Sequence, residues 1–493
     1  MKKPMAKKVL AAITAAAMTM SVAACGDDTT STATSTASTE TSVASTETSK
    51  EETVESTEVV EEEVSPYTVL KDANGNVYDL GGMEIIIRDW WSGDPSEPAN
   101  DFQEAQADYR EWIQETYNFT IKQQAISDWG STPSDFVDYA TTGGDENYVF
   151  AVYANPAITS AIKQGLVYDL STLDCLDFSQ NKFKANLVSE LYSINGGVYA
   201  MYLQDGGYPE ARDGVFFNKR VLTEAGIDPD SLYDMQADGT WTWDAFEEMC
   251  ATVQRDTDND GVDDVYGLGV NEGNFTTMAV VSNNGSYIGK DDNGYYYNLE
   301  SAETLEALEW AVSIYAAYDN HDPEGAEWNY YYDEFLAGKD AFLVEGAYCL
   351  YDGGQLSTCE DEVGFVMFPK GPQADTYVTL RSCNLYIIPA CYDAEKAWNI
   401  AFAYDLYMSN PPGYEDYCNM SSYTNGMFDS RALNETIPMM LEAEHGVVTY
   451  EGLIPNLDLG PDLTWNVGWW TTVSETVESI RDTWKAYVDE ANQ

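Results

Sequence analysis

The sequence predicts an α/β fold in which each of two lobes is a doubly wound, mostly parallel sheet. Short apolar runs alternate with stretches whose apolar residues recur at helical spacing, beginning at residue 83. The same alternation starts again after Gly206 and Gly207, which indicates two such series. No segment repeats with a period of about 20 to 50 residues, which argues against a solenoid or a propeller.

The first series predicts alternating strands and helices. Residues 83–87 form an apolar run typical of a strand, and Phe102, Ile113 and Tyr117 then recur at helical spacing. The elements expected after them are a strand at 119–125, a helix at 134–141, a strand at 148–154 and a helix at 156–164. Because ligands bind beyond the carboxyl ends of parallel strands, the loops that follow these strands are the prospective site.

The second series contains the same two kinds of element. Residues 214–217 form an apolar run, and Gly226 ends the helix expected at 219–225. Thr242 is a typical residue to begin a helix. The remaining expected elements are a helix carrying Leu305, Leu308, Val312 and Tyr315, a strand at 341–344, and an amphipathic terminal helix at 473–488.

Residues 1–24 have the pattern of an export signal. Four lysines precede an apolar stretch from 9 to 24 that ends in the letters VAA before Cys25. These residues resemble the lipobox of bacterial lipoproteins, which implies that Cys25 is acylated and that the lipid holds the chain on the extracellular face of the cell membrane. The alternative is ordinary signal cleavage, which would release a soluble protein.

Residues 25–65 are expected to be a disordered acidic stalk. From residue 26 to residue 65 the chain is almost entirely Thr, Ser, Ala, Val and Glu, with 11 acidic residues and one lysine, Lys50. Such a segment buries too little apolar surface to fold. A stalk of this kind lets a folded body stand away from the membrane while it stays concentrated near it.

The acidic composition restricts the partners of the chain. Its formal net charge is −60, with 84 acidic and 24 basic residues. Such a surface repels nucleic acid and anionic lipid, so binding to either is not expected.

The cysteines do not form a recognisable motif. Seven are present besides Cys25, and none has the CxxC spacing of a zinc ribbon or a thioredoxin-like site. A disulfide between Cys349 and Cys359 and a set of buried thiols are both compatible with an exported protein.

Three short segments of the body occur in a characteristic order. They are GVYAMY at 197–202 leading to GVFFNK at 214–219, TWTWD at 240–244, and GKDAFLVEGAY at 338–348. Together they resemble the large extracellular solute-binding family of ABC importers that includes the maltodextrin-binding proteins. The family often ends the third segment in Gly-Pro-Trp, whose Trp stacks on a sugar, whereas this chain has Gly-Ala-Tyr, so the ligand class stays open.

The resemblance implies a two-lobed fold of the type II periplasmic binding proteins, in which a hinge lets the lobes close on a solute. It places crossings between the lobes near 203–212 and 380–383. The first lobe would comprise residues 66–204 and 383–455, and the second residues 205–382 and 456–493. It also implies a monomer that captures a solute, above all an oligosaccharide, for the permease subunits of an ABC importer.

The candidate ligand residues of the first lobe follow the predicted strands. A sugar ring packs its C–H groups on an aromatic face, and Trp91 and Trp129 stand where such faces are needed. Asp94 is close enough to accept hydrogen bonds from sugar hydroxyl groups, and Asn155 follows the third strand. Because side chains alternate in direction, we expect Trp91 to face the ligand and Trp90 the core. For Trp129 a place in the core is an equal alternative.

The candidates of the hinge and the second lobe come from the resembled segments. Asp205, Tyr208 and Arg212 lie in the presumed hinge, where a side chain touches ligand only when the lobes are closed, although solvated linker residues are the alternative. Glu345 lies one turn from Tyr348, which can stack on a sugar. We expect Glu345 to accept hydrogen bonds from hydroxyl groups, the alternative being a carboxylate at a helix N-terminus.

Four further tryptophans divide into two pairs. Trp469 and Trp470 precede the terminal helix, where the family places an aromatic side chain at the mouth of the cleft. Ligand binding and a structural role are equal readings for this pair. Trp241 and Trp243 open a helix in the family pattern, so we expect them to be mainly structural.

Catalytic functions find little support. The sequence lacks phosphate-binding, dinucleotide-binding, zinc-protease and nucleophile-elbow motifs, and only His321 and His445 could act as imidazole bases. A glycoside hydrolase needs only two carboxylates about 5 to 10 Å apart, and such a pair cannot be picked out of so many acidic residues. A surface glycoside hydrolase, a polysaccharide-binding adhesin and a peptide-binding protein therefore remain as alternatives.

An acidic loop predicts one bound calcium ion. Residues 256–264 read DTDNDGVDD, with carboxylates at the first, third and fifth positions and Gly261 at the sixth. Ca²⁺ takes roughly six to eight oxygen ligands, which such a loop supplies. The expected ligands are Asp256, Asp258, Asp260, the carbonyl of Val262, and Asp264. Position twelve is Gly267 and not the bidentate Glu of an EF-hand, and a solvated acidic turn is the alternative.

Overall fold

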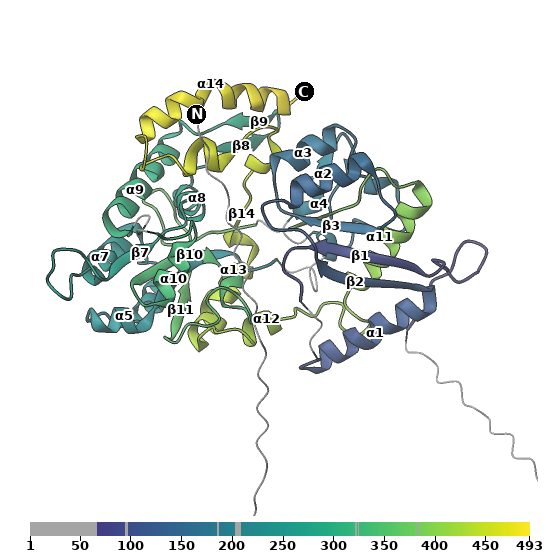
Figure 1. Ribbon diagram of the computed structural model, residues 1–493, viewed down its shortest axis with the longest axis horizontal. Coiled ribbons are helices and arrows are strands. Elements are labelled where there is room, and N and C mark those ends of the chain that lie inside the picture. The colour runs from purple at the N-terminus through teal and green to yellow at the C-terminus, as the bar shows by residue number, and fades with distance from the viewer. Residues whose placement is uncertain are drawn as a thin grey trace, which may run out of the picture. The chain divides into compact units, whose positions relative to one another are not determined.

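Two four-stranded sheets with helices packed against them form the framework of the chain (Figure 1). The computed structural model describes residues 67–93, 97–184, 187–202, 209–320, 323, 325–381 and 384–493. The predicted signal segment, the stalk and Cys25 lie outside these described residues, as do Asp94, Asp205 and Tyr208. Both expected series of strands and helices are present, so the predicted α/β class is confirmed.

The strands have the following bounds. The first sheet contains β1 (Met83–Asp89), β2 (Phe119–Ala125), β3 (Tyr148–Val152) and β13 (Leu385–Ile387). The second contains β6 (Asp213–Asn218), β7 (Tyr266–Gly269), β10 (Asp340–Gly346) and β11 (Val363–Val366). The short pairs are β4 (Ser193–Ile194) with β5 (Gly197–Val198), β8 (Ile288–Asp291) with β9 (Gly294–Tyr297), and β12 (Thr379–Leu380) with β14 (Gly446–Val447).

The helices of the described residues follow the same alternation. Those before the second sheet are α1 (Asp101–Tyr117), α2 (Thr132–Thr142), α3 (Pro156–Lys163) and α4 (Val188–Leu191). Those within and after it are α5 (Lys219–Glu224), α6 (Ser231–Asp238), α7 (Trp243–Val253), α8 (Glu272–Ser282), α9 (Ala302–Tyr318), α10 (Tyr330–Leu336), α11 (Ala394–Met408), α12 (Ser421–Thr424), α13 (Ile437–Leu441) and α14 (Val473–Ala491).

Local capping residues set several helix starts. The side chain of Asn100 accepts a hydrogen bond from the Gln103 amide at 3.0 Å, which begins α1. Thr242 caps α7, as its position in the sequence predicted. Thr472 and Glu475 form a reciprocal capping box at the start of α14.

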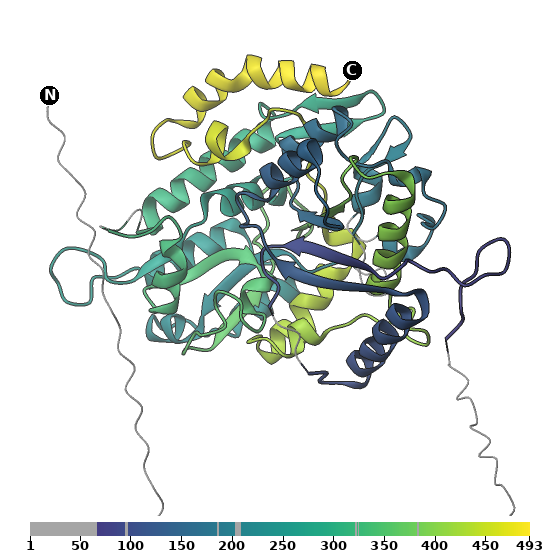
Figure 2. The same cartoon turned by 45° about the vertical axis from the view of Figure 1, so that its right-hand side comes forward.

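The first sheet has the strand order β13-β3-β1-β2, and helices cover both of its faces. β1 is parallel to β2 and to β3, whereas β13 joins β3 in the antiparallel direction. Successive side chains of β3 point to opposite faces. Val149 and Ala151 therefore pack in the core shared with α1 and α11, whereas Phe150 and Val152 pack in the core shared with α2 and α3. Both views show α11 beside α1 (Figure 1, Figure 2).

The second sheet has the order β11-β6-β10-β7 and is mixed in direction. Only β10 and β7 are parallel, since β6 runs antiparallel to both β10 and β11. The expectation of a mostly parallel sheet thus holds for the first sheet and not for the second. All seven residues of β10 are buried, so packed elements cover both faces of this sheet as well.

Buried side chains show where the chain passes between the two cores. Met201 belongs to the core of the first sheet and Ala211 to that of the second, and Leu380 packs against the second core whereas Leu385 lies in the first. The chain therefore passes between the cores within each of these two intervals.

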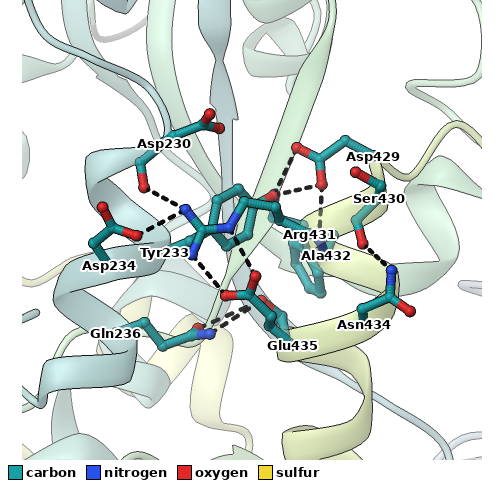
Figure 3. A network of polar contacts seen from close by, with 12 residues as sticks. Asp230, Tyr233, Asp234, Gln236, Asp429, Ser430, Arg431, Ala432, Asn434 and Glu435 are labelled. Carbon is teal, nitrogen blue, oxygen red and sulfur yellow. Dashed lines mark hydrogen bonds and ion pairs between the residues drawn. The ribbon is translucent and has the colours of Figure 1, made fainter.

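The segment after α11 packs differently from the expected lobe boundary at residue 455. Its buried side chains Tyr423, Phe428, Ala432, Ile437, Met440 and Ile454 join the core of the second sheet. Polar contacts fix the same segment to α6 (Figure 3): Arg431 pairs with Asp234 at 2.9 Å, and Tyr233 donates a hydrogen bond to Asp429 at 2.8 Å. Short helices turn their apolar faces to the second sheet here. Within the expected first-lobe segment 383–455, β13, α11 and Leu453 therefore pack with the first sheet, whereas the buried side chains between Tyr423 and Met440 pack with the second.

Two sequence questions are settled by packing. Trp241 and Trp243 are buried, and the Trp243 ring stacks on Trp310 with centroids 4.1 Å apart, so both are structural. Cys349 and Cys359 are buried free thiols, so they do not form the disulfide that the sequence left open.

Candidate functional site

An aromatic cluster occupies the carboxyl ends of the first three strands, which we call the first edge. Trp91 follows β1, Trp129 follows β2 and Tyr153 follows β3. The rings of Trp129 and Tyr153 are stacked with centroids 4.8 Å apart, and Trp90 packs edge-on against Trp91 at 4.6 Å. Trp91 is 46% and Trp129 56% exposed, so each presents an aromatic face to solvent. Tyr153 was missed from the sequence, although it follows a strand in the same way.

Polar groups hold the turns of the first edge. Asp89 at the end of β1 is fully buried and accepts hydrogen bonds from Gln123 Nε2 at 3.1 Å and from the Ser92 amide at 3.2 Å. Asn155 caps α3, its side-chain oxygen accepting a hydrogen bond from the Ala157 amide at 2.8 Å. Burial raises the pKa of the Tyr153 hydroxyl, and a hydrogen bond with Asn155 opposes that rise.

The second edge is formed by the start of β6, the carboxyl ends of β7 and β10, and the first turn of α8. Because β6 and β10 are antiparallel, Asp213 lies opposite Gly346. This register brings Arg212 and Tyr348 together, with the guanidinium carbon 5.5 Å from the centroid of the Tyr348 ring. At that distance the cation is attracted to the face of the ring. The structure therefore joins two predicted residues that are far apart in the sequence.

Glu345 is buried beneath this edge, and its carboxylate accepts hydrogen bonds from side chains of the protein. It is 1% exposed and accepts hydrogen bonds from Asn271 Nδ2 at 2.6 Å and from Asn274 Nδ2 at 2.7 Å. The Tyr348 hydroxyl donates a further hydrogen bond to it at 3.1 Å. Burial raises the pKa of Glu345, and these hydrogen bonds oppose the rise. Glu345 thus orients the two amides and the phenol, and the direct ligand contact expected from the sequence stays a prediction.

Several members of the second edge were not identified from the sequence. Asn271 caps α8 and also donates a hydrogen bond to the Tyr331 hydroxyl at 3.2 Å. Asn271 lies two residues after the end of β7, so the strand-end rule used for the first edge could have found it. Asn274 and Tyr331 depend on the packing of α8 and α10, which the sequence pattern does not show.

The two tryptophans before α14 differ in their surroundings: protein contacts fix Trp469, whereas Trp470 is exposed. The Trp469 indole donates a hydrogen bond to Glu272 at 3.1 Å, and its ring lies 4.7 Å from that of Tyr315. Trp470 is 78% exposed. Glu272 is the first residue of α8, so both tryptophans adjoin the second edge.

The described part of the first crossing carries a partly buried carboxyl group. Glu210 lies 3.5 Å from the Tyr202 hydroxyl and 4.0 Å from the Arg212 guanidinium. Burial raises the pKa of Glu210, and the positive charge of Arg212 opposes that rise. This carboxyl group connects the two cores, because Tyr202 packs against the first and Arg212 begins the second edge.

The acidic loop before β7 brings three of its predicted calcium ligands together. Single carboxylate oxygens of Asp256, Asp258 and Asp260 lie within 4.8 Å of one another. The Asp256 carboxylate accepts hydrogen bonds from the Asn259 amide at 2.6 Å and the Gly261 amide at 2.8 Å. Gly261 has a φ of 95°, a backbone conformation that favours glycine. The loop is therefore curved around one point, as cation ligation requires.

The other two predicted calcium ligands behave differently. The Asp264 carboxylate accepts hydrogen bonds from the amide and the hydroxyl of Thr257, and these lower its pKa. It therefore closes the loop and is not grouped with the three carboxylates. Val262 is exposed, and its amide donates a hydrogen bond to Asp260 at 2.8 Å.

Comparison with known proteins assigns the chain to a family. The family model described as "Bacterial extracellular solute-binding protein" matches residues 100–440. The chain belongs to this family. The resemblance stated from the three short segments is therefore confirmed, and with it the two-lobed type II binding-protein fold.

Solved structures of other solute-binding proteins share the fold at low identity. UgpB from Mycobacterium tuberculosis in complex with glycerophosphocholine is 17% identical, with a TM-score of 0.57 over 84% of this chain and 100% of that one. The cyclic α-maltosyl-1,6-maltose binding protein from Arthrobacter globiformis is 14% identical, with a TM-score of 0.55 over 84% and 99%. The GacH receptor of Streptomyces glaucescens is 14% identical, with a TM-score of 0.55 over 83% and 99%.

The sequence of this solute-binding protein matches no curated protein. Within the described part of the chain, no helix combines the length and the apolar character needed to cross a bilayer. Membership places the chain in a family of extracellular proteins.

Proposed function

We propose that this solute-binding protein captures an uncharged oligosaccharide by closure of its two lobes and delivers it to the permease of an ABC importer. The observation that carries the proposal is the pairing of exposed indole faces at the first edge with an oriented set of amides and a phenol at the second. Sugars need both, because their C–H faces stack on aromatic rings whereas their hydroxyl groups need fixed donors and acceptors.

The charge of the chain supports a neutral ligand. With 84 acidic residues against 24 basic ones, the protein repels anions over most of its surface. Arg212 is the cation at the second edge, and it lies between the Glu210 carboxyl group and the Tyr348 ring. Two proteins of the same fold, from Arthrobacter globiformis and Streptomyces glaucescens, are described with a maltose-type saccharide and with acarbose.

Calorimetric titration separates the possible ligand classes. The panel comprises neutral oligosaccharides, oligopeptides and glycerophosphocholine, the last because UgpB is described in complex with it. We expect an oligosaccharide to bind and the others not to bind, with shortened saccharide products absent after prolonged incubation. Tight peptide binding without sugar binding would refute the sugar proposal, and shortened products would favour the hydrolase alternative. A fall in the radius of gyration on saturation distinguishes lobe closure from a polymer-binding adhesin.

We further propose that the lipid on Cys25 anchors the chain. Support comes from the apolar stretch and the small residues before Cys25 and from the acidic segment after it. A Cys25→Ala chain should leave the membrane fraction for the medium and lose labelling by a fatty-acid probe. Retention of the variant at the membrane with its label intact would contradict this anchor.

The acidic loop supports a proposed structural calcium ion in the second lobe. Asp256, Asp258 and Asp260 supply the hard oxygen ligands that Ca²⁺ prefers, on a loop already curved by Gly261. Calcium should raise the melting temperature and a chelator should lower it, because an ion that binds only the folded state stabilises that state. Asp256→Asn should lose this dependence, whereas Asp292→Asn, at an exposed position of the β8–β9 hairpin, should keep it. If neither calcium nor chelator changes the melting temperature, the loop is a solvated turn that binds no calcium.

A further inference from the structure

Three potential metal ligands meet at one turn beside β14, and none of them belongs to either edge or to the acidic loop. They are Glu442, Glu444 and His445, and one ligand atom from each lies within 4.8 Å of the others. The His445 Nε2 atom is 3.7 Å from Glu442 Oε2 and 3.8 Å from Glu444 Oε1. Residues 443–445 form a single 3-10 turn that follows Glu442 directly, so the two carboxylates and the ring come from four consecutive residues.

The hydrogen-bond partner of His445 Nδ1 determines the tautomer of the neutral ring. His445 Nδ1 lies 2.8 Å from the carbonyl oxygen of Tyr377 and 3.4 Å from Thr376 Oγ1. A carbonyl oxygen only accepts hydrogen bonds, so Nδ1 must carry the hydrogen. In the neutral ring the lone pair then lies on Nε2, which faces the two glutamates. A backbone carbonyl behind the ring in this way is the arrangement that orients histidine ligands in metalloproteins.

Burial divides the three side chains into a fixed ligand and two adjustable ones. The His445 side chain is 10% exposed, whereas those of Glu442 and Glu444 are 60% and 77% exposed. The ring is therefore held by packing, while both carboxylates can move to meet an ion. Tetrahedral ligands at the usual zinc distances lie about 3.3 Å apart. Each glutamate therefore needs to move a few tenths of an ångström closer to His445 Nε2, and the two exposed carboxylates, whose ligand atoms lie within 4.8 Å of each other, close the remaining separation.

A simple hydrogen-bonded ion pair fits the distances less well. A charged imidazolium would hold a carboxylate oxygen at about 2.8 Å, well inside both observed separations. Arg381 donates a hydrogen bond to the Glu442 carbonyl oxygen at 2.5 Å, so its guanidinium faces the backbone of the turn. The side-chain oxygens of Glu442 and Glu444 stay directed at Nε2.

We propose that Glu442, Glu444 and His445 bind one zinc ion or a similar divalent transition-metal ion, with water completing its coordination. An imidazole nitrogen with two carboxylate oxygens is a donor set that zinc accepts, whereas calcium prefers oxygen alone. The site lies at the start of β14, which pairs with β12 in the segment that leads from the second core to the first. The ion therefore braces one of the crossings between the lobes, independently of the solute bound at the edges.

Titration of the purified full chain with Zn²⁺, in excess Ca²⁺ to fill the acidic loop, tests the site. We expect one ion with micromolar affinity and a rise in melting temperature. The double variant Glu442→Gln and Glu444→Gln should weaken Zn²⁺ binding at least about tenfold and remove the rise. Both substituted side chains are exposed, so folding should be unaffected. Asp292→Asn, at an exposed position of the β8–β9 hairpin, is the matched control and should keep wild-type Zn²⁺ binding.

Cobalt provides a spectroscopic check of the same ligands. Co²⁺ bound in place of Zn²⁺ should give a visible absorption band that the double variant lacks. Absence of Zn²⁺ binding by the wild-type chain would overturn the proposal. Equal Zn²⁺ affinity in the wild-type chain and the double variant would also overturn it, because the ion would then sit elsewhere, for instance on a cysteine.

Discussion

The two edges present different kinds of side chain, although each lies where strands of its sheet end. The first presents the exposed rings of Trp91 and Trp129, supported by Tyr153. The second presents amides and a phenol whose orientation is set from below by the buried carboxyl group of Glu345. Aromatic faces tolerate several ring positions, whereas a hydrogen-bond network admits few. We infer that the first edge supplies adaptable contact area and the second supplies discrimination.

Removal of Glu345 should have the largest effect, because the whole network of the second edge depends on it. Glu345→Ala leaves the donors of Asn271, Asn274 and Tyr348 without their acceptor, at a cost of about 3 kcal/mol in the free energy of unfolding. Solute affinity should fall about a hundredfold. Thermal melts and calorimetry measure the two effects, with Glu309→Gln at an exposed position of α9 as control. If Glu345→Ala leaves the affinity for the solute unchanged, the proposal that the second edge supplies discrimination is wrong.

Substitution of the exposed tryptophans should weaken binding without loss of stability. Trp91→Ala and Trp129→Ala should each raise the dissociation constant for an oligosaccharide about tenfold, since one stacked face is lost in each. The melting temperature should stay unchanged because both side chains are exposed. Tyr296→Ala is a matched control, since Tyr296 is 44% exposed on β9, outside both edges. A similar loss in that control would show that the effect is not specific.

The buried acids of the second lobe should make stability depend on pH. Burial raises the pKa of Asp319 from 3.8 to about 8, and it raises that of Asp340 as well. Neither carboxyl oxygen of Asp340 has a hydrogen-bond partner among the described residues. The folded state therefore binds more protons than the unfolded chain between about pH 4 and 8, so stability should fall as pH rises through that window.

Because the buried acids lower stability at high pH, substitution of one of them should stabilise the protein there. Asp340→Asn removes the cost of keeping this carboxyl group protonated in the folded state, so it should raise the free energy of unfolding by about 1 kcal/mol at pH 8, with little change at pH 4. Denaturant titrations at the two pH values measure this difference. A wild-type stability that increases from pH 5 to pH 8 would contradict the protonated state of these acids.

Arg212→Lys should have the smallest effect. Lysine keeps the charge but loses the planar group that lies over the Tyr348 ring, so the dissociation constant for the solute should rise about threefold. Calorimetry at low and high salt separates this contribution from general electrostatics. A loss of solute affinity as large as that expected for Glu345→Ala would show that Arg212 belongs to the hydrogen-bond network around Glu345.

Sequence reasoning found the first edge more completely than the second. Trp91 and Trp129 were predictable because each lies in the loop that follows a strand recognisable from its apolar residues. The Glu345 network was not, since it depends on the antiparallel register of β6 and β10 and on the packing of α8. The mixed strand directions of the second sheet could not be predicted either, because periodicity identifies strands but not the strands with which they pair.

The lobe boundary illustrates a second limit. The helices α12 and α13 are four and five residues long, too short to show a helical period. Their apolar residues could have packed on either core, and only the contacts of Arg431 and Asp429 show which. The lipid anchor, the ligand class and the calcium ion stay predictions.

The place of β13 has a consequence for the order of folding. Leu385 pairs with Val152 in the first sheet, yet all four strands of the second sheet lie between them in the sequence. The first sheet therefore stays incomplete until the chain has been made through α11, whose buried face also covers that sheet. A fragment ending near residue 202 would expose an open strand edge and an apolar surface, both of which promote aggregation. Contacts between segments so distant in the sequence also make folding slow, which leaves the emerging chain unfolded for longer.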